Sequence, residues 1–364
     1  MREAMRPGTA FTRRRFLAGL GSATAAAAFL AACGDSDDEP EATPTSTGTP
    51  DATTATATSE ATATATEAAG GFTFTDGRGV TVTLDKQPER VVAYHAPAAA
   101  LWHLGITPVG VFGGALPEES PNLADIDVTG IEDVGHVYGE IDLEKLVLLK
   151  PDLIVTAFSP VQGELTWGFA DLDVQAQVQE IAPIVAINGI EDPTDVIASF
   201  EELAVAMGVE VDTPEYADAR AGFDQAVEDF QAAVAEKEGL TAVALSNFGG
   251  EVYFAKPELA PALRQLNQWG LQFVDVQAGE GEFWEIVSFE QVNKYPADLL
   301  LFDTSPEVGL DELAERPAWQ ALPAVAADQI APWDKLENWS YAAYAADIEA
   351  ITEVIQRSDP DVVA

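Results

Sequence analysis

The chain has 364 residues with 18 Lys and Arg against 61 Asp and Glu, so its formal net charge at pH 7 is −43. Nucleic-acid binding relies on basic surface stripes, and a charge of this sign and size excludes it. The residues from Phe72 onward outnumber what one hydrophobic core usually holds, so we expect two lobes in that part of the chain.

The N-terminus has the features of an export signal. Arg13 and Arg14 precede Phe16 and a weakly apolar, Ala- and Gly-rich run over 17–32. A membrane-spanning helix needs about 20 strongly apolar residues, so a processed signal peptide over residues 1–33 fits better. The paired arginines predict twin-arginine export, and the alternative is an ordinary secretory signal with an extra arginine.

Cys33 is the only cysteine and ends a lipobox-like Leu-Ala-Ala-Cys sequence at 30–33. We predict that its thiol carries a diacylglycerol, because two acyl chains anchor a protein stably where one is marginal. Residues 34–71 are mainly Thr, Ala, Pro and acidic residues, which predicts a disordered tether. Together these segments predict an extracytoplasmic protein that is lipid-anchored to the cell membrane.

Short apolar strands alternate with helices over 72–190 and 240–364, and a helical connector over 191–239 separates these two stretches. In the N-terminal lobe a hairpin is expected at 72–84, strands at 91–94, 109–111, 153–155 and 184–187, and helices at 97–104 and 142–149. In the C-terminal lobe strands are expected at 241–245, 251–254, 273–276 and 299–302, and helices at 258–269, from 289 onward and at 341–355. The alternation predicts an α/β fold of two doubly wound lobes, with a ligand cleft between them.

Residues 142–155 and 288–301, one segment in each predicted lobe, form an internal echo without gaps. Each has a capping residue, an apolar residue, a glutamate and, eight residues after the glutamate, an Asp-Leu strand entry. A glutamate near a helix N-terminus gains about 0.3–1 kcal/mol from the helix dipole, which explains one such residue. Two equivalent glutamates, Glu144 and Glu290, also fit a pair of acidic contacts for a two-fold partner.

Several stretches together carry a family resemblance. They are Pro-Glu-Arg-Val-Val at 88–92, Leu-Gly-Ile-Thr-Pro-Val-Gly-Val at 104–111, the segment 142–155, Ile-Val-Ser-Phe-Glu at 286–290 and Trp-Gln-Ala-Leu-Pro-Ala-Val at 319–325. Their order and spacing resemble the iron-siderophore and cobalamin class of substrate-binding proteins of ABC importers. The resemblance implies lobes joined by a long rigid helix, a shallow cleft that closes little, and docking of Glu144 and Glu290 onto arginines of an ABC permease dimer. We expect the protein to be a monomer.

Ligands of doubly wound lobes lie beyond the carboxyl ends of the strands, which here are followed by loops rich in aromatic residues. The candidate ligand-binding residues are Tyr94, His95, His136, Tyr138, Phe158, Trp167, Asn247, Phe248, Trp284, Trp333 and Trp339. Aromatic loops suit a large amphipathic metal chelate, although each such side chain also fits packing within its lobe. Arginine is scarce in these loops, which favours a nearly neutral ligand, such as a ferric hydroxamate siderophore or cobalamin, over a trianionic catecholate.

Two other functions are weighed against chelate capture. Haem or a bare metal ion could bind through His95, His136, Tyr94 or Tyr138, but no closely spaced metal-ligand motif occurs in the sequence. A secreted enzyme is the second alternative, but the sequence has no G-x-S-x-G elbow and no phosphate-binding glycine loop. We therefore expect a binding protein with no catalytic residues, no metal site of its own and no cofactor.

Overall fold

A computed structural model describes residues 71–364, except 125, 280, 305–307, 335–338 and 364. The predicted signal with Arg13 and Arg14, the lipidation site Cys33 and nearly all of the predicted tether lie outside these residues. All described residues fall within one unit of dense internal contacts, Ala63–Ala364. In this part of the chain no helix is long and apolar enough to cross a membrane.

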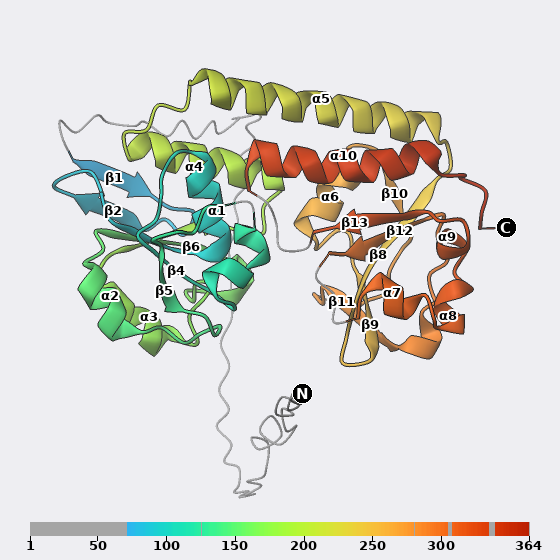
Figure 1. Cartoon of the computed structure of the whole chain (residues 1–364), viewed down its shortest axis with the longest axis horizontal. Helices are drawn as coiled ribbons and strands as arrows, with labels where there is room; N and C mark the ends of the chain where they lie inside the picture. Colours follow the sequence, from blue (N-terminus) through green and yellow to red (C-terminus); the bar gives the residue numbers. More distant parts are fainter. Residues whose placement is uncertain (1–70, 125, 280, 305–307, 335–338, 364) are drawn as a thin grey trace, which may run out of the picture. The chain divides into compact units, whose positions relative to one another are not determined.

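The N-terminal lobe is built on a five-stranded, fully parallel sheet (Figure 1). Its strand order is β5 (Glu132–Gly135), β4 (Gly110–Phe112), β3 (Val91–Tyr94), β6 (Leu153–Phe158) and β7 (Ile184–Asn188). The helices that follow strands are α1 (His95–His103), α2 (Leu143–Leu149) and α3 (Leu172–Gln179), with short 3-10 turns η1 (Pro117–Glu119), η2 (Pro121–Leu123) and η3 (Pro160–Gln162).

Both faces of this sheet are covered, which explains why its strands are apolar throughout. Val91 and Ala93 point into a core shared with α1 and α4, whereas Val92 points into a second core with Leu146 of α2 and Val178 of α3. Successive residues of a strand face opposite sides of the sheet, so this alternation is the direct signature of a doubly wound lobe.

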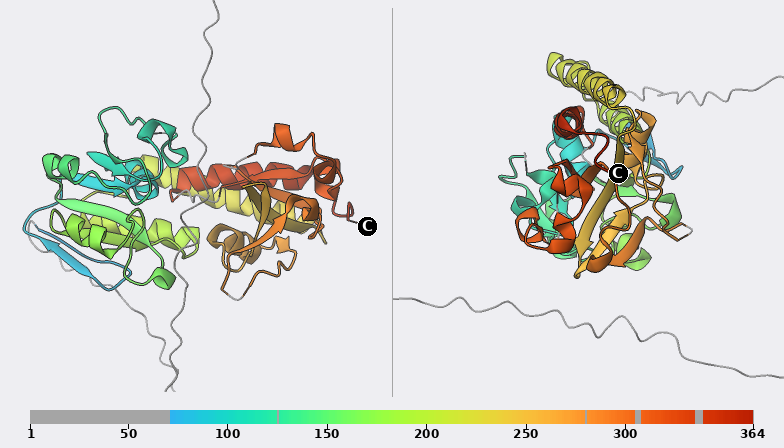
Figure 2. Two further views of the ribbon diagram at one scale, coloured as in Figure 1. Left: turned by 90° about the horizontal axis from the view of Figure 1, so that it is seen from below. Right: turned by 90° about the vertical axis from the view of Figure 1, so that its right-hand side faces the viewer.

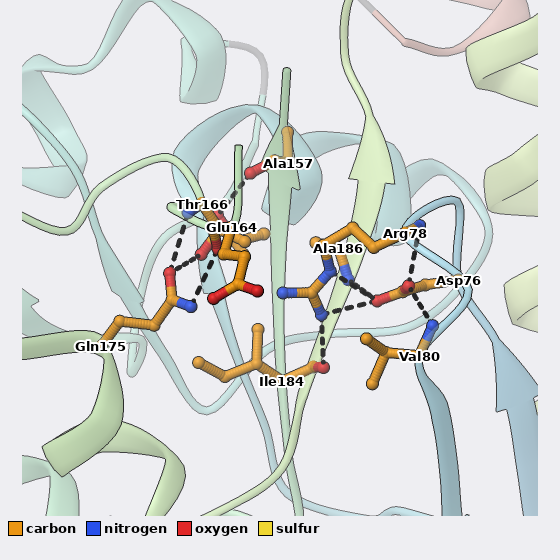
Figure 3. A network of polar contacts seen from close by, with 10 residues as sticks. Asp76, Arg78, Val80, Ala157, Glu164, Thr166, Gln175, Ile184 and Ala186 are labelled. Carbon is orange, nitrogen blue, oxygen red and sulfur yellow. Dashed lines mark hydrogen bonds and ion pairs between the residues drawn. The ribbon is translucent and has the colours of Figure 1, made fainter. Parts of the chain in front are cut away.

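A hairpin of β1 (Phe72–Thr75) and β2 (Thr81–Leu84) covers the exposed edge of β7 through a buried ion pair (Figure 3). Asp76 Oδ2 accepts hydrogen bonds from Arg78 Nη2 at 2.6 Å and from the backbone N–H of Ala186 at 3.1 Å. Arg78 Nη2 also donates to the carbonyl of Ile184 at 3.1 Å. The hairpin thus satisfies backbone groups that an edge strand would leave open for another chain.

Two helices connect the lobes, α4 (Pro193–Ala206) and the long α5 (Pro214–Glu236). Thr213 caps α5 by accepting a hydrogen bond from the N–H of Tyr216 at 3.2 Å. The C-terminal helix α10 (Tyr341–Arg357) packs along α5, as Figures 1 and 2 both show. One continuous hydrophobic core runs from β3 of the N-terminal lobe through α4, α5 and α10 to β12 of the C-terminal lobe, which favours a rigid connection.

The C-terminal lobe has a mixed sheet in the order β11-β9-β8-β12-β13. Its strands are β8 (Thr241–Phe248), β9 (Glu251–Ala255), β10 (Gln272–Phe273), β11 (Trp284–Ser288), β12 (Leu299–Asp303) and β13 (Ile330–Trp333). Its helices are α6 (Pro261–Gln268), α7 (Leu310–Leu313), α8 (Pro317–Gln320) and α9 (Pro323–Ala326). β8, β12 and β13 are parallel, and β9 is antiparallel to both of its neighbours.

The α/β class with two sheet-containing lobes is confirmed, and two predicted elements of the second lobe are wrong in extent. The helix expected from residue 289 is only a 3-10 turn, η4 (Phe289–Gln291). Of the strand expected at 273–276, only its first residue pairs, as part of β10 beside β8. After η4, Tyr295 and Lys294 each bind the carboxylate of Glu285, and the hydroxyl of Tyr295 also accepts a hydrogen bond from the N–H of Gln277, just after the expected strand, at 2.8 Å.

Candidate functional site

Several of the predicted site residues lie at or just after the carboxyl ends of the parallel strands. Tyr94 ends β3 and His95 begins α1, while Trp333 ends β13 in the other lobe. Phe248 ends β8, at a turn in which both glycines that follow it have positive φ. Trp284 begins β11, and its ring lies 5.9 Å from the ring of Trp333.

Tyr94 belongs to an aromatic group on the N-terminal lobe. Its ring centroid lies 6.2 Å from that of His95 and 5.7 Å from that of Phe112. A Cβ at Gly168 would lie 2.8 Å from the Tyr94 ring, so a glycine is required for this packing. Burial, and to a lesser extent Tyr138, raises the pKa of Tyr94 to about 12, so its phenol is neutral at physiological pH.

His95 is a buried imidazole, with 4% of its surface exposed. Burial lowers its pKa to about 4, and the charge of Asp133 opposes this shift without cancelling it. A Cβ at Gly113 would lie 2.5 Å from Nδ1 of His95, so the loop after β4 makes room for the ring. At neutral pH His95 therefore offers one N–H donor and one nitrogen acceptor but no charge.

His136 and Tyr138 lie on the exposed loop after β5. Nδ1 of His136 lies 2.7 Å from Oδ2 of Asp133, and the other oxygen of this carboxylate accepts a hydrogen bond from the N–H of Gly135 at 2.9 Å. Tyr138 is 54% exposed, so little of its ring is engaged within the lobe. This loop therefore presents a fixed imidazole and a largely free phenol.

Trp167 and Trp339 bring residues of the two lobes into contact. Their ring centroids are 6.1 Å apart, and Trp339 also stacks on Phe200 of α4 at 5.7 Å. The backbone of Trp167 is fixed to β6, because its N–H donates to the carbonyl of Ala157 at 2.8 Å. Figure 3 shows the adjacent Thr166, whose N–H and hydroxyl both donate to Oε1 of Gln175. Because Trp339 is stacked against Phe200 as well as Trp167, it packs between the lobes.

Two predicted site residues have clear packing roles. The side-chain amide of Asn247 binds the backbone of Val308 in both directions, at 2.9 and 2.8 Å, and so holds the loop after β12. Phe158 is 3% exposed and packs against Gly77 of the hairpin. Their contact with a ligand stays a prediction, to which this geometry adds no support.

Polar groups with no partner among the described residues occur at both carboxyl edges. The indole Nε1 of Trp333 and the hydroxyl of Ser159, which directly follows β6, are buried and make no hydrogen bond there. Such groups are costly unless a ligand or water satisfies them. Ser159 was not predicted from the sequence, where only its position just after an apolar strand could have indicated it.

The charged residues at these carboxyl edges are almost all acidic. The segments that follow the strands at this edge, which include helix α1, span 95–103, 113–131, 136–142, 159–171 and 189–192 in the first lobe, and 249–250, 304–309 and 334–340 in the second. They contain no arginine, many acidic residues and a single lysine, Lys335, which lies outside the described residues. Within the described chain, no three His, Cys, Asp or Glu side chains gather into a potential metal site.

The echo segments have the same anchoring contact in both lobes. Asp152 Oδ2 accepts hydrogen bonds from the N–H groups of Glu89 and Arg90, just before β3. Asp298 Oδ2 accepts from the N–H and hydroxyl of Thr241, the first residue of β8. Burial raises the pKa of Asp152, but the backbone hydrogen bonds and the nearby Lys86 outweigh it and hold that pKa below its usual range.

The two glutamates of the echo are both exposed at helix starts. Glu144 lies in the first turn of α2, which Asp142 caps by accepting a hydrogen bond from the N–H of Lys145 at 3.0 Å. Glu290 lies in η4, where its own backbone N–H and Ser288 lower its pKa. Neither glutamate is needed for packing within its lobe.

A cavity of about 360 Å³ lies elsewhere, at the amino ends of β3, β4 and β5. It is lined by Arg90, Thr107, Pro108, Val109, Thr129, Gly130, Ile131, Glu132 and Leu149. Because it opens at the opposite end of the sheet from Tyr94 and His95, it is separate from the predicted ligand edge.

Comparison with known proteins places the chain in a family. It is 25% identical over 293 residues to YhfQ of Bacillus subtilis (strain 168), a protein assigned to the substrate-binding lipoproteins of ABC transporters, and this match covers 76% of this chain and 84% of YhfQ. Its fold is similar to DesE, a ferric-siderophore receptor from Streptomyces coelicolor, with a TM-score of 0.73, 28% identity, and coverage of 79% of this chain and 99% of DesE.

A further similar fold is the siderophore periplasmic binding protein from the fuscachelin gene cluster of Thermobifida fusca, with a TM-score of 0.56, 22% identity, and coverage of 74% of this chain and 97% of that one. The names of these relatives describe substrate-binding and receptor proteins. Residues 109–336 match the family model of periplasmic binding proteins, which is well over half of the chain. The resemblance read from the sequence is thereby confirmed, and the chain belongs to the periplasmic binding protein family.

Proposed function

We propose that this protein is the solute-binding component of an ABC importer and captures a ferric siderophore, of the hydroxamate type, at the carboxyl edges of its two lobes. The ligand is bound without conversion and handed to the permease. The similarity to DesE, whose name describes a ferric-siderophore receptor, supports the substrate class. The residues of this chain support the hydroxamate type.

The observation that carries the hydroxamate assignment is the chemistry of the strand-end loops. They offer neutral groups, namely the imidazole of His95, the phenol of Tyr94 and the indole N–H of Trp333, and they contain no arginine. A ferric tris-hydroxamate core is uncharged, whereas a ferric tris-catecholate carries three negative charges. Without guanidinium donors, and with acidic loops all around, a trianion would be repelled.

Delivery to the permease is proposed to use Glu144 and Glu290, the two positions at which the family resemblance implies docking onto permease arginines. Both are exposed, and each lies two positions after the N-cap residue of its segment, Asp142 or Ser288. The continuous core through α4, α5 and α10 favours lobes that keep their spacing when the ligand binds. A constant spacing suits two acidic contacts that must meet two basic sockets at once.

Export and anchoring complete the proposal. Arg13 and Arg14 would direct twin-arginine export, and Cys33 would carry the lipid that holds the mature protein at the outer face of the membrane. The assignment of YhfQ to the lipoproteins supports this part.

The experiment is a titration of tryptophan fluorescence in residues 71–364 with a ferric tris-hydroxamate, a ferric catecholate, cobalamin, haem and free ferric ion. We expect saturable quenching at sub-micromolar concentration by the tris-hydroxamate alone, since Trp333 ends β13 at the predicted edge and the ring of Trp284 lies 5.9 Å from its ring. Quenching by the catecholate would refute the charge argument. Quenching by haem, cobalamin or free iron in its place would assign the protein to one of those ligands.

A further inference from the structure

Helix α2 exposes two aliphatic side chains beside Glu144. Val147 and Leu148 of α2 are 54% and 78% exposed. They follow Glu144 by three and four positions, so the three side chains lie on one face of the helix. We call Glu144, Val147 and Leu148 the N-lobe docking face.

The C-terminal lobe has the equivalent surface with different chemistry. Leu146 and Val292, one position earlier than the exposed pair in each echo segment, are both 1% exposed, so each segment buries the residue at this position, although the first is helix α2 and the second continues from the 3-10 turn η4. The positions of Val147 and Leu148 are occupied there by Asn293 and Lys294, both exposed. Lys294 forms an ion pair with Glu285. One lobe therefore presents a glutamate with aliphatic neighbours on a helix, and the other a glutamate in a 3-10 turn that is followed by an exposed amide and an exposed ammonium.

We propose that the N-lobe docking face binds a permease half that presents a basic residue next to an apolar patch, and that the half facing Glu290 is a different surface. This inference rests on the proposed delivery function and names the chemistry of its partner. A permease with two identical halves would meet two unlike surfaces on the binding protein. In a permease with two different halves, each half can match one of these surfaces, and the binding protein then docks in a single orientation.

Charge decides among the possible occupants of this face. A second copy of this chain would bring together two surfaces of a protein with a net charge of −43, and the carboxylate of Glu144 stands at the centre of the contact. A basic socket satisfies that carboxylate, while the aliphatic side chains lose their exposed surface to the apolar rim. The ligand is not expected there, because its edge is formed by loops that follow strands.

The test compares import with ligand binding in variants made in the full, anchored protein at its own chromosomal position. V147N/L148N removes the apolar surface without changing charge, and V147N/L148K gives the N-terminal lobe the chemistry of the other lobe. The matched control is V205N, since Val205 is 52% exposed on α4, away from this face. E144R reports on docking itself. Uptake of radioactive ferric chelate, fluorescence titration and the melting temperature are measured for each.

We expect both double variants to lower the uptake rate about tenfold at limiting protein, which is typical of removing a central apolar contact, while affinity and melting temperature stay as in the wild type. V205N should leave all three unchanged. Wild-type uptake by both double variants, with E144R inactive, would overturn the apolar face and leave docking intact. Wild-type uptake by E144R would instead remove the proposed docking role of Glu144. A wild-type dimer that the double variants dissociate, without loss of uptake, would assign the face to self-association.

Discussion

The stability of this protein is expected to fall in mild acid because of one side chain, His95. Its pKa is lowered from 6.5 to about 4 in the folded protein, chiefly by burial. In the unfolded chain the imidazole regains its ordinary pKa, so between these two values the unfolded state binds more protons than the folded state. Stability that is fully present above pH 6.5 is therefore lost as the pH falls through 4. At 1.36 kcal/mol per pKa unit, the loss amounts to about 3 kcal/mol.

The assay is urea unfolding of residues 71–364 at several pH values from 7 to 4, for the wild type and for H95Q. The many carboxylates titrate in both proteins, so the difference between the two free energies of unfolding isolates the imidazole. We expect the wild type to lose about 3 kcal/mol more than H95Q across this range. Parallel stability curves for the two proteins would refute the burial of a neutral His95, whatever their absolute stabilities.

Three other predictions follow from named contacts. D76A should lower the free energy of unfolding by about 3–5 kcal/mol, because it leaves Arg78 buried without its partner. Amide hydrogen exchange at Ala186, whose N–H donates to Asp76, should accelerate. A loss of stability no larger than that caused by an exposed Asp→Ala change would count against the buried pair. W333F should weaken binding of a ferric tris-hydroxamate about tenfold by removing the indole N–H, and unchanged affinity would show that this group does not contact ligand. C33A should move the protein from the membrane to the soluble fraction, and persistent membrane association would argue against the lipid anchor.

Four of the five strands in the sheet of the first lobe could be predicted because their apolar sequence leaves little choice, whereas β5, with its acidic residues, was not predicted. Val91-Val92-Ala93 and 184–187 are apolar on both faces, and both faces are covered in the structure. A helix is predicted from Phe289 onward because the spacing there equals that of the segment that forms α2, but only a 3-10 turn forms. What the pattern could not reveal is that Glu285 draws in Lys294 and Tyr295, which favours a single turn over a longer helix.

The sequence predicts that the ligand site lies at the carboxyl edges of the sheets, but it does not predict which residues contact the ligand. Aromatic side chains after strands are equally suited to ligand contact and to packing, and the structure contains both kinds. Tyr94 and Trp333 end strands, and the buried indole N–H of Trp333 has no partner among the described residues, whereas Trp339 is stacked between Phe200 and Trp167. A long-range stack of this kind depends on the placement of α4, which no local pattern in the sequence contains.

The internal echo separates structural from functional reasons for a repeated residue. Asp152 and Asp298 recur because each accepts N–H groups at the start of the first strand of its sheet, so folding alone explains them. Glu144 and Glu290 recur at exposed positions with no such contact, and helix-dipole energy of about 0.3–1 kcal/mol is weak as a sole reason for both. Because folding does not require these two repeated glutamates, their recurrence favours contact with a partner that has two matching sites. The divergence of the neighbouring exposed positions then indicates that the two sites are not the same.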